Sequence, residues 1–101
     1  MQIQIRTKDD LVKLLSEGFS YAWRINKSRL SSITEVEIYN FSGNTKIVGV
    51  FDRDKIKVLE NGRVAVAFIN AKIEPCEFKW VGQYPIKYKN TNNEELEFNQ
   101  R

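Results

Sequence analysis

The order of apolar and polar positions along the chain predicts a series of short strands. Apolar and polar residues alternate over several stretches, and this two-residue period is typical of a strand with one buried face. The predicted strands cover residues 2–6, 19–26, 34–41 and 45–51 and the two arms on either side of Asn61-Gly62.

One segment near the start has helical spacing instead. Leu11, Leu14 and Leu15 lie three and four residues apart, which places them on one face of a helix. Thr7 is the candidate N-cap, and Gly18 is the candidate end. The pattern therefore predicts one N-terminal helix of about ten residues.

The strand at 19–26, FSYAWRIN, has two distinct faces because side chains alternate across a strand. The face expected to join the core carries Phe19, Tyr21, Trp23 and Ile25. The other face carries Ser20, Ala22, Arg24 and Asn26. The alternation predicts that Trp23 is structural, and that residues 27–32 form a turn or a single helical turn.

The next two strands differ in pattern. In residues 34–41, the inward positions are Val36 and Ile38. The outward positions are Glu35, Glu37, Tyr39 and Phe41, of which the two aromatic residues are candidates for exposure. Residues 45–51 are apolar on both faces, which predicts a central strand with Gly49 at a bend or a close approach.

The hairpin around Asn61-Gly62 allows an argument about register. A two-residue loop would pair Val58 with Ala65, whereas a three-residue loop pairs Val58 with Val64. The second register brings bulky apolar residues together, and a slip by one residue would turn them to the wrong face. We therefore predict a three-residue loop with Gly62 in the left-handed conformation.

The last third of the chain is less regular. Residues 71–82 could form a strand or begin a short helix at Pro75. YPIKYK and ELEFN predict a final hairpin across NTNN. The predicted pairs are Lys89 with Glu95, Lys87 with Glu97, Ile86 with Phe98, and Tyr88 with Leu96.

Together these elements predict a single domain over residues 1–101 of the α+β class. It would have one N-terminal helix and a strongly curled, mostly antiparallel sheet or small β-barrel of six to seven strands.

Composition and charge narrow the class of protein. A chain of 101 residues with 42% hydrophobic and 29% charged residues is typical of a globular domain. Its net charge of +3 is only a weak indication of polyanionic partners. No apolar run approaches the roughly 20 residues that span a bilayer, no signal-peptide pattern is present, and the single Cys76 cannot form an internal disulfide. We expect a cytoplasmic protein without a membrane partner.

The chemistry available to the chain does not favour catalysis. Histidine is absent, which removes the commonest general base and the commonest metal ligand. Cys76 has no histidine to activate it, and acidic pairs such as Asp52 and Asp54 are better explained as turn residues. We predict a protein that is not an enzyme and that has no metal site or cofactor. A carboxylate-only enzyme with a metal at Asp52 and Asp54 stays as a third hypothesis.

Basic and aromatic residues together are typical of proteins that bind single-stranded nucleic acid. Most of the twelve aromatic residues fall on apolar faces, where a core role is the commoner one. Arg24 could pair with Glu35 or Glu37 on a neighbouring strand, whereas Lys46 has no evident partner. The predicted binding residues are Arg24, Asn26, Lys27, Arg29, Arg53 and Tyr84, and Tyr39 and Trp80 are further candidates for stacking on bases.

Several short motifs carry a resemblance to a known family. In order they are YAWRINKSRL, VEIYNF, IVGVFDRDKI, NGRVAVAF and GQYPIKYKN, which together span about residues 21–90. Their order resembles a small β-rich accessory module found alone or attached to GIY-YIG-type nucleases and other mobile-element proteins. The layout is also similar to PUA and EVE-type barrels, which hold a nucleobase in a pocket. The resemblance implies a non-catalytic accessory role and directs attention to Trp23, Arg24, Arg29, Arg63, Gln83, Pro85 and Tyr88.

The leading hypothesis is a non-catalytic module that binds nucleic acid, either a base or a single-stranded end. The alternative is a protein-interaction or inhibitor domain of phage or mobile-element type, because the chain is small and exposed strand edges suit such a role. The sequence leaves the oligomeric state open.

Overall fold

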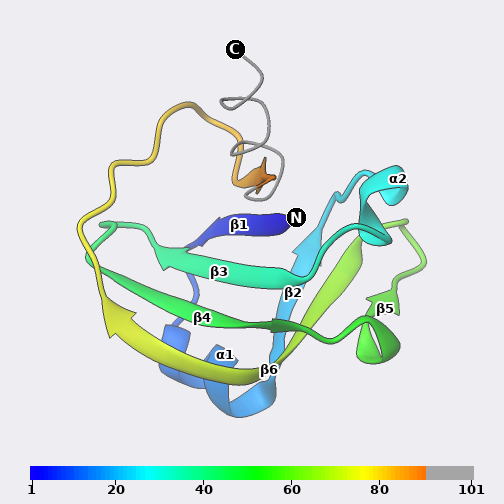
Figure 1. Ribbon diagram of the computed structural model, residues 1–101, viewed down its shortest axis with the longest axis horizontal. Coiled ribbons are helices and arrows are strands. Elements are labelled where there is room, and N and C mark those ends of the chain that lie inside the picture. The colour runs from blue at the N-terminus through cyan, green and yellow to red at the C-terminus, as the bar shows by residue number, and fades with distance from the viewer. Residues whose placement is uncertain (91–101) are drawn as a thin grey trace, which may run out of the picture.

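A curled β-sheet dominates the computed structural model, which describes residues 1–90 (Figure 1). The helices are α1 (Leu11–Glu17) and α2 (Lys27–Leu30), and a 3-10 turn, η1, spans Arg53–Lys55. The strands are β1 (Gln2–Thr7), β2 (Phe19–Trp23), β3 (Glu35–Asn40), β4 (Thr45–Phe51), β5 (Lys57–Val58), β6 (Val64–Pro75) and β7 (Ile86–Lys89).

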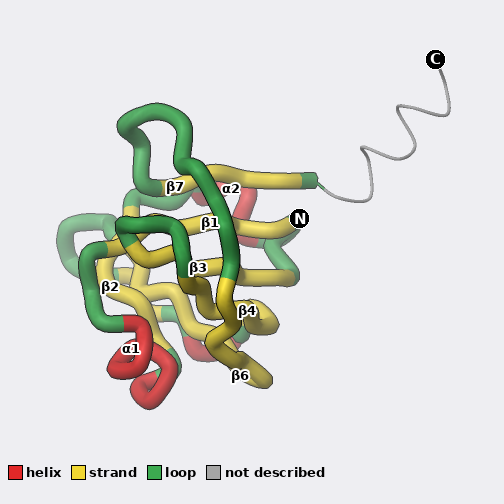
Figure 2. Tube along the Cα trace, turned by 90° about the vertical axis from the view of Figure 1, so that its left-hand side faces the viewer, coloured by secondary structure: helices red, strands yellow, loops and turns green. Residues whose placement is uncertain are grey.

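The strand order in the sheet is β2-β6-β4-β3-β1-β7, and β5 pairs with β6 off this path. Only β1 and β3 run parallel among the strand pairs of residues 1–90. The sheet curls strongly into a half-barrel whose edge strands are β2 and β7 (Figures 1 and 2). The predicted curled, mostly antiparallel sheet is therefore confirmed, although the described part has a half-barrel and two short helices.

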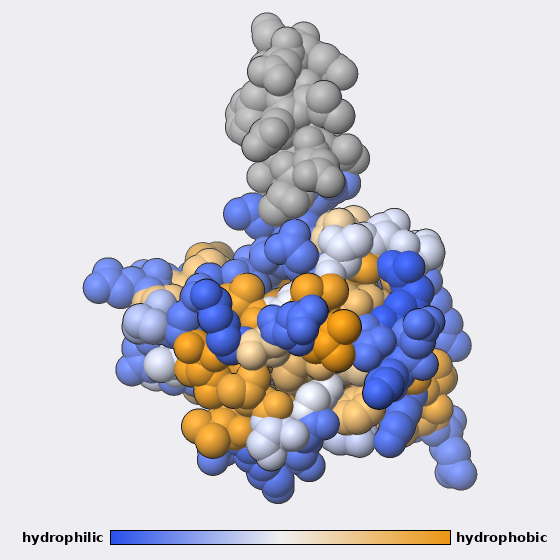
Figure 3. All heavy atoms as spheres, turned by 60° about the horizontal axis from the view of Figure 1, so that its bottom comes forward, coloured by the Kyte–Doolittle hydropathy of each residue, from blue (hydrophilic) through white to orange (hydrophobic). Residues whose placement is uncertain are grey.

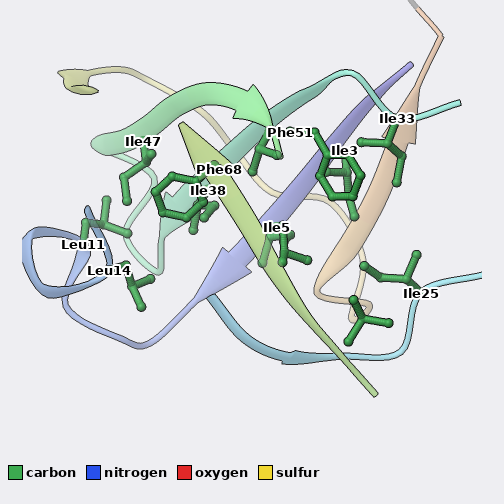
Figure 4. Packing of buried hydrophobic residues seen from close by; sticks show 13 residues of the cluster. Ile3, Ile5, Leu11, Leu14, Ile25, Ile33, Ile38, Ile47, Phe51 and Phe68 are labelled. Atoms are coloured by element: carbon green, nitrogen blue, oxygen red, sulfur yellow. The ribbon is translucent and has the colours of Figure 1, made fainter. Parts of the chain in front are cut away.

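The hydrophobic core fills the inside of the curl (Figure 4). Its fully buried members come from different strands and the segment before β3: Ile3, Ile5, Ile33, Val36, Ile38, Ile47, Val64 and Val66. Helix α1 contributes Leu11 and Leu14 beside Ile47 and Phe68 at one end of the core. Each large aliphatic side chain buried in this way contributes roughly 1.5–3 kcal/mol. The edge strands add partly buried side chains that pack against this core, Trp23 from β2 and Ile86 and Tyr88 from β7.

The N-terminal helix is shorter than the spacing of leucines predicted. Thr7 belongs to β1, where it pairs with Asn40. The N-cap is Asp10, whose Oδ1 accepts a hydrogen bond of 3.0 Å from the backbone N–H of Val12. The predicted end is confirmed, because Gly18 caps the helix with a φ of 76°.

Two local predictions in the sheet are confirmed. Val58 pairs with Val64, and Gly62 has a φ of 81°, as the three-residue loop requires. Strand β4 lies between β3 and β6, and a Cβ on Gly49 would come within 2.9 Å of the Cβ of Ala71. Glycine is therefore needed there for close approach of the strands.

The alternation predicted for residues 19–26 is wrong over its first half. Ser20 is fully buried and Tyr21 is 45% exposed, which is the reverse of the prediction. The pairing of β2 with β6 shifts register between Ser20 and Trp23, and such a bulge breaks the two-residue period. Trp23 is half-buried and packs against the edge of the core.

Residues 71–82 form neither a separate strand nor a helix. Strand β6 continues to Pro75, and residues 76–85, called the 76–85 loop below, have no regular structure and lead to β7. The predicted hairpin partners of β7, residues 94–98, lie outside the described residues.

Candidate functional site

A groove of about 490 Å³ lies where the half-barrel is open, between the edge strands β2 and β7. Its size is in the range of roughly 300–1,000 Å³ that is usual for ligand-binding clefts. We call it the edge groove. Its lining residues are Trp23, Arg24, Asn26, Arg63, Tyr84, Pro85, Ile86 and Tyr88.

Hydrogen bonds hold the walls of the edge groove in position. The indole N–H of Trp23 donates to Ser20 Oγ at 2.9 Å, and the Arg63 guanidinium donates to the carbonyl of Ala22 at 3.1 Å. Across the opening, the backbone N–H of Asn26 donates to the hydroxyl of Tyr88 at 3.2 Å. The bonds of Trp23 and Tyr88 hold these two rings in place before any ligand arrives, which lowers the cost of binding.

Arg24 differs from Arg63, the other arginine in the lining, because its guanidinium has no partner among residues 1–90. The side chain is exposed, and it forms no hydrogen bond or ion pair with any residue that the structure describes. The predicted pairing with Glu35 or Glu37 is wrong, because β6 and β4 separate β2 from β3 in the sheet. No acidic residue is among those that line the groove within residues 1–90.

Three predicted binding residues lie at the start of α2, next to the groove. Asn26 is the N-cap of α2, and its Oδ1 accepts hydrogen bonds from the N–H and hydroxyl of Ser28 at 3.1 and 2.7 Å. Lys27 is exposed on α2 and has no partner among the described side chains. The Arg29 guanidinium lies 4.7 Å from the centre of the Tyr88 ring, a cation–π distance.

Tyr84 stands at the rim of the edge groove. Its side chain is 81% exposed, and its backbone carbonyl accepts a hydrogen bond of 2.8 Å from the Trp80 indole. Pro85 follows it, and proline favours an extended conformation in the residue before it. Tyr84 therefore presents an exposed aromatic ring from a backbone segment that a hydrogen bond holds in place.

Arg53 is not among the residues that line the groove. Its guanidinium donates to the carbonyls of Ser31 and Ile33 at 3.0 and 2.8 Å, which ties η1 to the segment between α2 and β3. The structure thus gives this predicted phosphate contact a role in local structure.

A second region with aromatic and charged residues lies where the 76–85 loop packs on the sheet, and the loop itself contributes Phe78 and Trp80. We call it the covered cluster: Gln4, Glu37, Tyr39, Lys46, Phe78 and Trp80. Glu37 was predicted to face outward and Tyr39 to be exposed, yet they are only 8% and 3% exposed. Both predictions are wrong because Phe78 stacks on Tyr39 with ring centres 4.4 Å apart and covers this face.

Hydrogen bonds satisfy the charges in the covered cluster. Glu37 accepts from Lys46 Nζ and from the Tyr39 hydroxyl, each at 2.7 Å, and from Gln4 Nε2 at 3.2 Å. Lys46, predicted to have no partner, also lies 4.0 Å from a carboxylate oxygen of Glu74. This arrangement is a partly buried structural ion pair.

The pKa values in the covered cluster follow from these contacts. Burial on its own would raise the pKa of Glu37, but the hydrogen bonds from Lys46, Tyr39 and Gln4 hold it below the usual value. Burial, followed by the hydrogen bond to Glu37, raises the pKa of Tyr39. Both groups therefore keep their ordinary charge states near neutral pH.

A hollow of about 550 Å³ lies beside this cluster, between the turn after β3 and the 76–85 loop. Arg6 and Phe41 belong to the lining of this hollow. The Arg6 guanidinium donates to the carbonyl of Phe41 at 3.1 Å and lies 3.8 Å from the centre of the Phe41 ring. Cys76, also in its lining, donates from Sγ to the carbonyl of Gly43 at 3.3 Å. Burial raises the pKa of the Cys76 thiol, which keeps it in the less reactive protonated form.

Metal ligands and membrane-spanning helices were also considered for residues 1–90. Within residues 1–90, no group of three or more Cys, Asp or Glu side chains is placed to hold a metal ion. No helix in the same range is long and apolar enough to cross a membrane.

The structure thus brings together Arg24, Asn26 and Tyr84 from the predicted site and places Lys27 and Arg29 beside them. The residue patterns did not select Trp23, Arg63, Pro85, Ile86 and Tyr88, although the family resemblance pointed to all of these except Ile86. The alternation of side chains along a single strand could not predict the groove, because the walls of the groove come from β2 and β7, which are distant in sequence.

No protein-family model, curated protein or solved structure matches the chain. The resemblance to the GIY-YIG-associated module and to PUA and EVE-type barrels therefore stays a prediction from short motifs.

Proposed function

We propose that this protein is a non-catalytic module that binds single-stranded nucleic acid in the edge groove. One observation carries the proposal: Arg24, which has no partner among residues 1–90, lies beside a preformed apolar groove that has aromatic walls. Nucleic-acid strands present the complementary chemistry, since they alternate flat apolar bases with negative phosphates.

In this proposal the aromatic residues and the basic residues have separate tasks. Tyr84 or Trp23 stacks on an unpaired base, an interaction worth about 1–3 kcal/mol per base. Arg24 and Lys27 contact phosphates, which adds affinity without reading sequence. A single strand is favoured over a duplex because only unpaired bases expose their faces for stacking.

Fluorescence anisotropy with labelled DNA and RNA oligonucleotides of about 10 nucleotides tests the proposal. At about 50 mM salt we expect binding that weakens as salt rises, because bound phosphates release counterions. Replacement Arg24→Gln should weaken binding about fivefold or more, since a charge-assisted contact contributes about 1 kcal/mol or more.

The matched control is Lys72→Gln, which removes one positive charge from a side chain that is 74% exposed on β6. Lys72 does not line the groove, so its loss should change affinity less than twofold. Equal effects of the two replacements, or no binding at low salt, would contradict the proposal.

A protein partner is the second candidate, because apolar side chains are exposed on the outside of the sheet. Val50 of β4 pairs with Ile69 of β6, and they are 44% and 47% exposed. Figure 3 shows apolar patches among charged side chains on the face that carries β6. A nuclease-resistant protein complex that is lost on Ile69→Thr, but not on Arg24→Gln, would support this candidate.

A further inference from the structure

We propose that the acidic segment 94–98, EELEF, docks in the edge groove of its own chain and competes there with nucleic acid. The docking is argued from the groove, and only the competition rests on the proposed function. The segment itself lies outside the described residues. The shape of the groove, the short connection between the groove and the segment, and the charges of both support the docking.

The connection is short. Ile86 and Tyr88 of β7 line the groove, and the described chain ends at Asn90, one residue after β7. The first glutamate of the segment, Glu94, follows four residues later. A connection of this length keeps the segment near the groove at a local concentration of about millimolar, so even weak contacts suffice for docking.

The free side of β7 suits a segment with alternating residues. Among the strands of residues 1–90, β7 pairs only with β1, so its other edge has no strand partner there. The pairing expected from the sequence sets Leu96 opposite Tyr88 and Phe98 opposite Ile86. Since opposite residues share a face of a sheet, this pairing would bring Leu96 and Phe98 to the groove side.

Charge is complementary between the segment and the groove. In the expected pairing, Glu94 shares the groove side with Leu96 and Phe98, and the lining there includes Arg24 and Arg63 and no acidic residue among those described. Glu95 and Glu97 face Lys89 and Lys87 on the other side of the strand. The groove side of the segment thus carries a ring and a negative charge, the two kinds of group that a nucleotide would bring.

The test uses the full chain with the three replacements Glu94→Gln, Glu95→Gln and Glu97→Gln together. The control has Glu17→Gln, Glu60→Gln and Glu77→Gln, which change the net charge equally at residues that do not line the groove. If the segment occupies the groove about two-thirds of the time, its release should tighten oligonucleotide binding about threefold. An equal gain in the control would overturn the proposal.

The NMR signal of the Trp23 indole, recorded without oligonucleotide, tests docking by itself. We expect it to move in the 94–97 variant and in Phe98→Ser, but not in the control. A moved signal in a protein that binds no oligonucleotide would support docking and contradict the proposed function. An unmoved signal, or a shift that depends on protein concentration as docking between chains requires, would overturn the inference.

Discussion

The edge groove and the covered cluster both contain aromatic and basic side chains, yet they differ in the contacts that those side chains make. In the covered cluster, Lys46 pairs with Glu37 and the aromatic rings pack on one another. In the edge groove, Arg24 has no partner among the described residues and Tyr84 is 81% exposed.

This difference shows why composition alone does not identify a binding surface. Aromatic residues that pack on each other and charged side chains that pair with each other already use these contacts to stabilise the fold. An arginine and an aromatic ring that remain exposed beside a preformed groove still have their interactions available for a ligand. The predictions below test this division between a structural region and a binding region.

The largest effect is expected in the covered cluster, on stability. Replacement Glu37→Gln leaves Lys46 without its partner at 2.7 Å and should lower the free energy of unfolding by about 2–3 kcal/mol. Denaturant titration measures the change. Oligonucleotide affinity of the folded variant should stay within twofold of the parent, and a large loss of affinity would place the covered cluster in the binding site.

The same pair predicts how stability depends on pH. Because the pKa of Glu37 is lowered in the folded state, its contribution is present above the unfolded value, about 4.3, and is lost as the pH falls through the folded value. The stability difference between parent and Glu37→Gln should be constant near neutral pH and should shrink below about pH 4. A difference that grows in acid would contradict this account.

The next effect is on binding. Tyr84→Ser removes an exposed ring from the groove rim and should weaken oligonucleotide binding about five- to thirtyfold, the equivalent of about 1–2 kcal/mol of stacking. Tyr84→Phe keeps the ring and serves as the matched control, with affinity near that of the parent. Loss of affinity in the Phe variant would show that the hydroxyl, rather than stacking, is what matters.

Arg53→Gln should have a smaller effect than the changes above, and it should lower stability rather than affinity, which is the reverse of Arg24→Gln. It removes hydrogen bonds to the carbonyls of Ser31 and Ile33 and should cost about 1 kcal/mol of stability. Affinity for an oligonucleotide should fall less than twofold. Thermal unfolding and anisotropy on the same sample would reveal the reverse pattern, a loss of affinity without a loss of stability, if Arg53 contacts the ligand.

Features set by neighbouring residues could be predicted from the sequence. The register of Val58 with Val64 follows from the local geometry of the turn at Gly62. The central place of β4 follows from apolar residues on both of its faces. In each case a few adjacent residues contain the whole physical reason.

Features that need distant segments could not be predicted. Glu37 is buried because Phe78 and Trp80, some forty residues away in the chain, cover that face of the sheet. Tyr21 is exposed because the bulge between β2 and β6 reverses the alternation. The edge groove requires β2 and β7 to face each other, which the curl of the whole sheet determines.

The most direct test of the central claim follows the two tryptophans, since Trp23 lines the edge groove and Trp80 belongs to the covered cluster. Their indole N–H signals can be recorded by NMR while a single-stranded oligonucleotide is added at low salt. The account predicts that the Trp23 signal moves and saturates at the affinity measured by anisotropy, and that the Trp80 signal, whose N–H donates to the carbonyl of Tyr84 at the groove rim, moves less. Movement of Trp80 with Trp23 unchanged, or no movement of either signal, would contradict it.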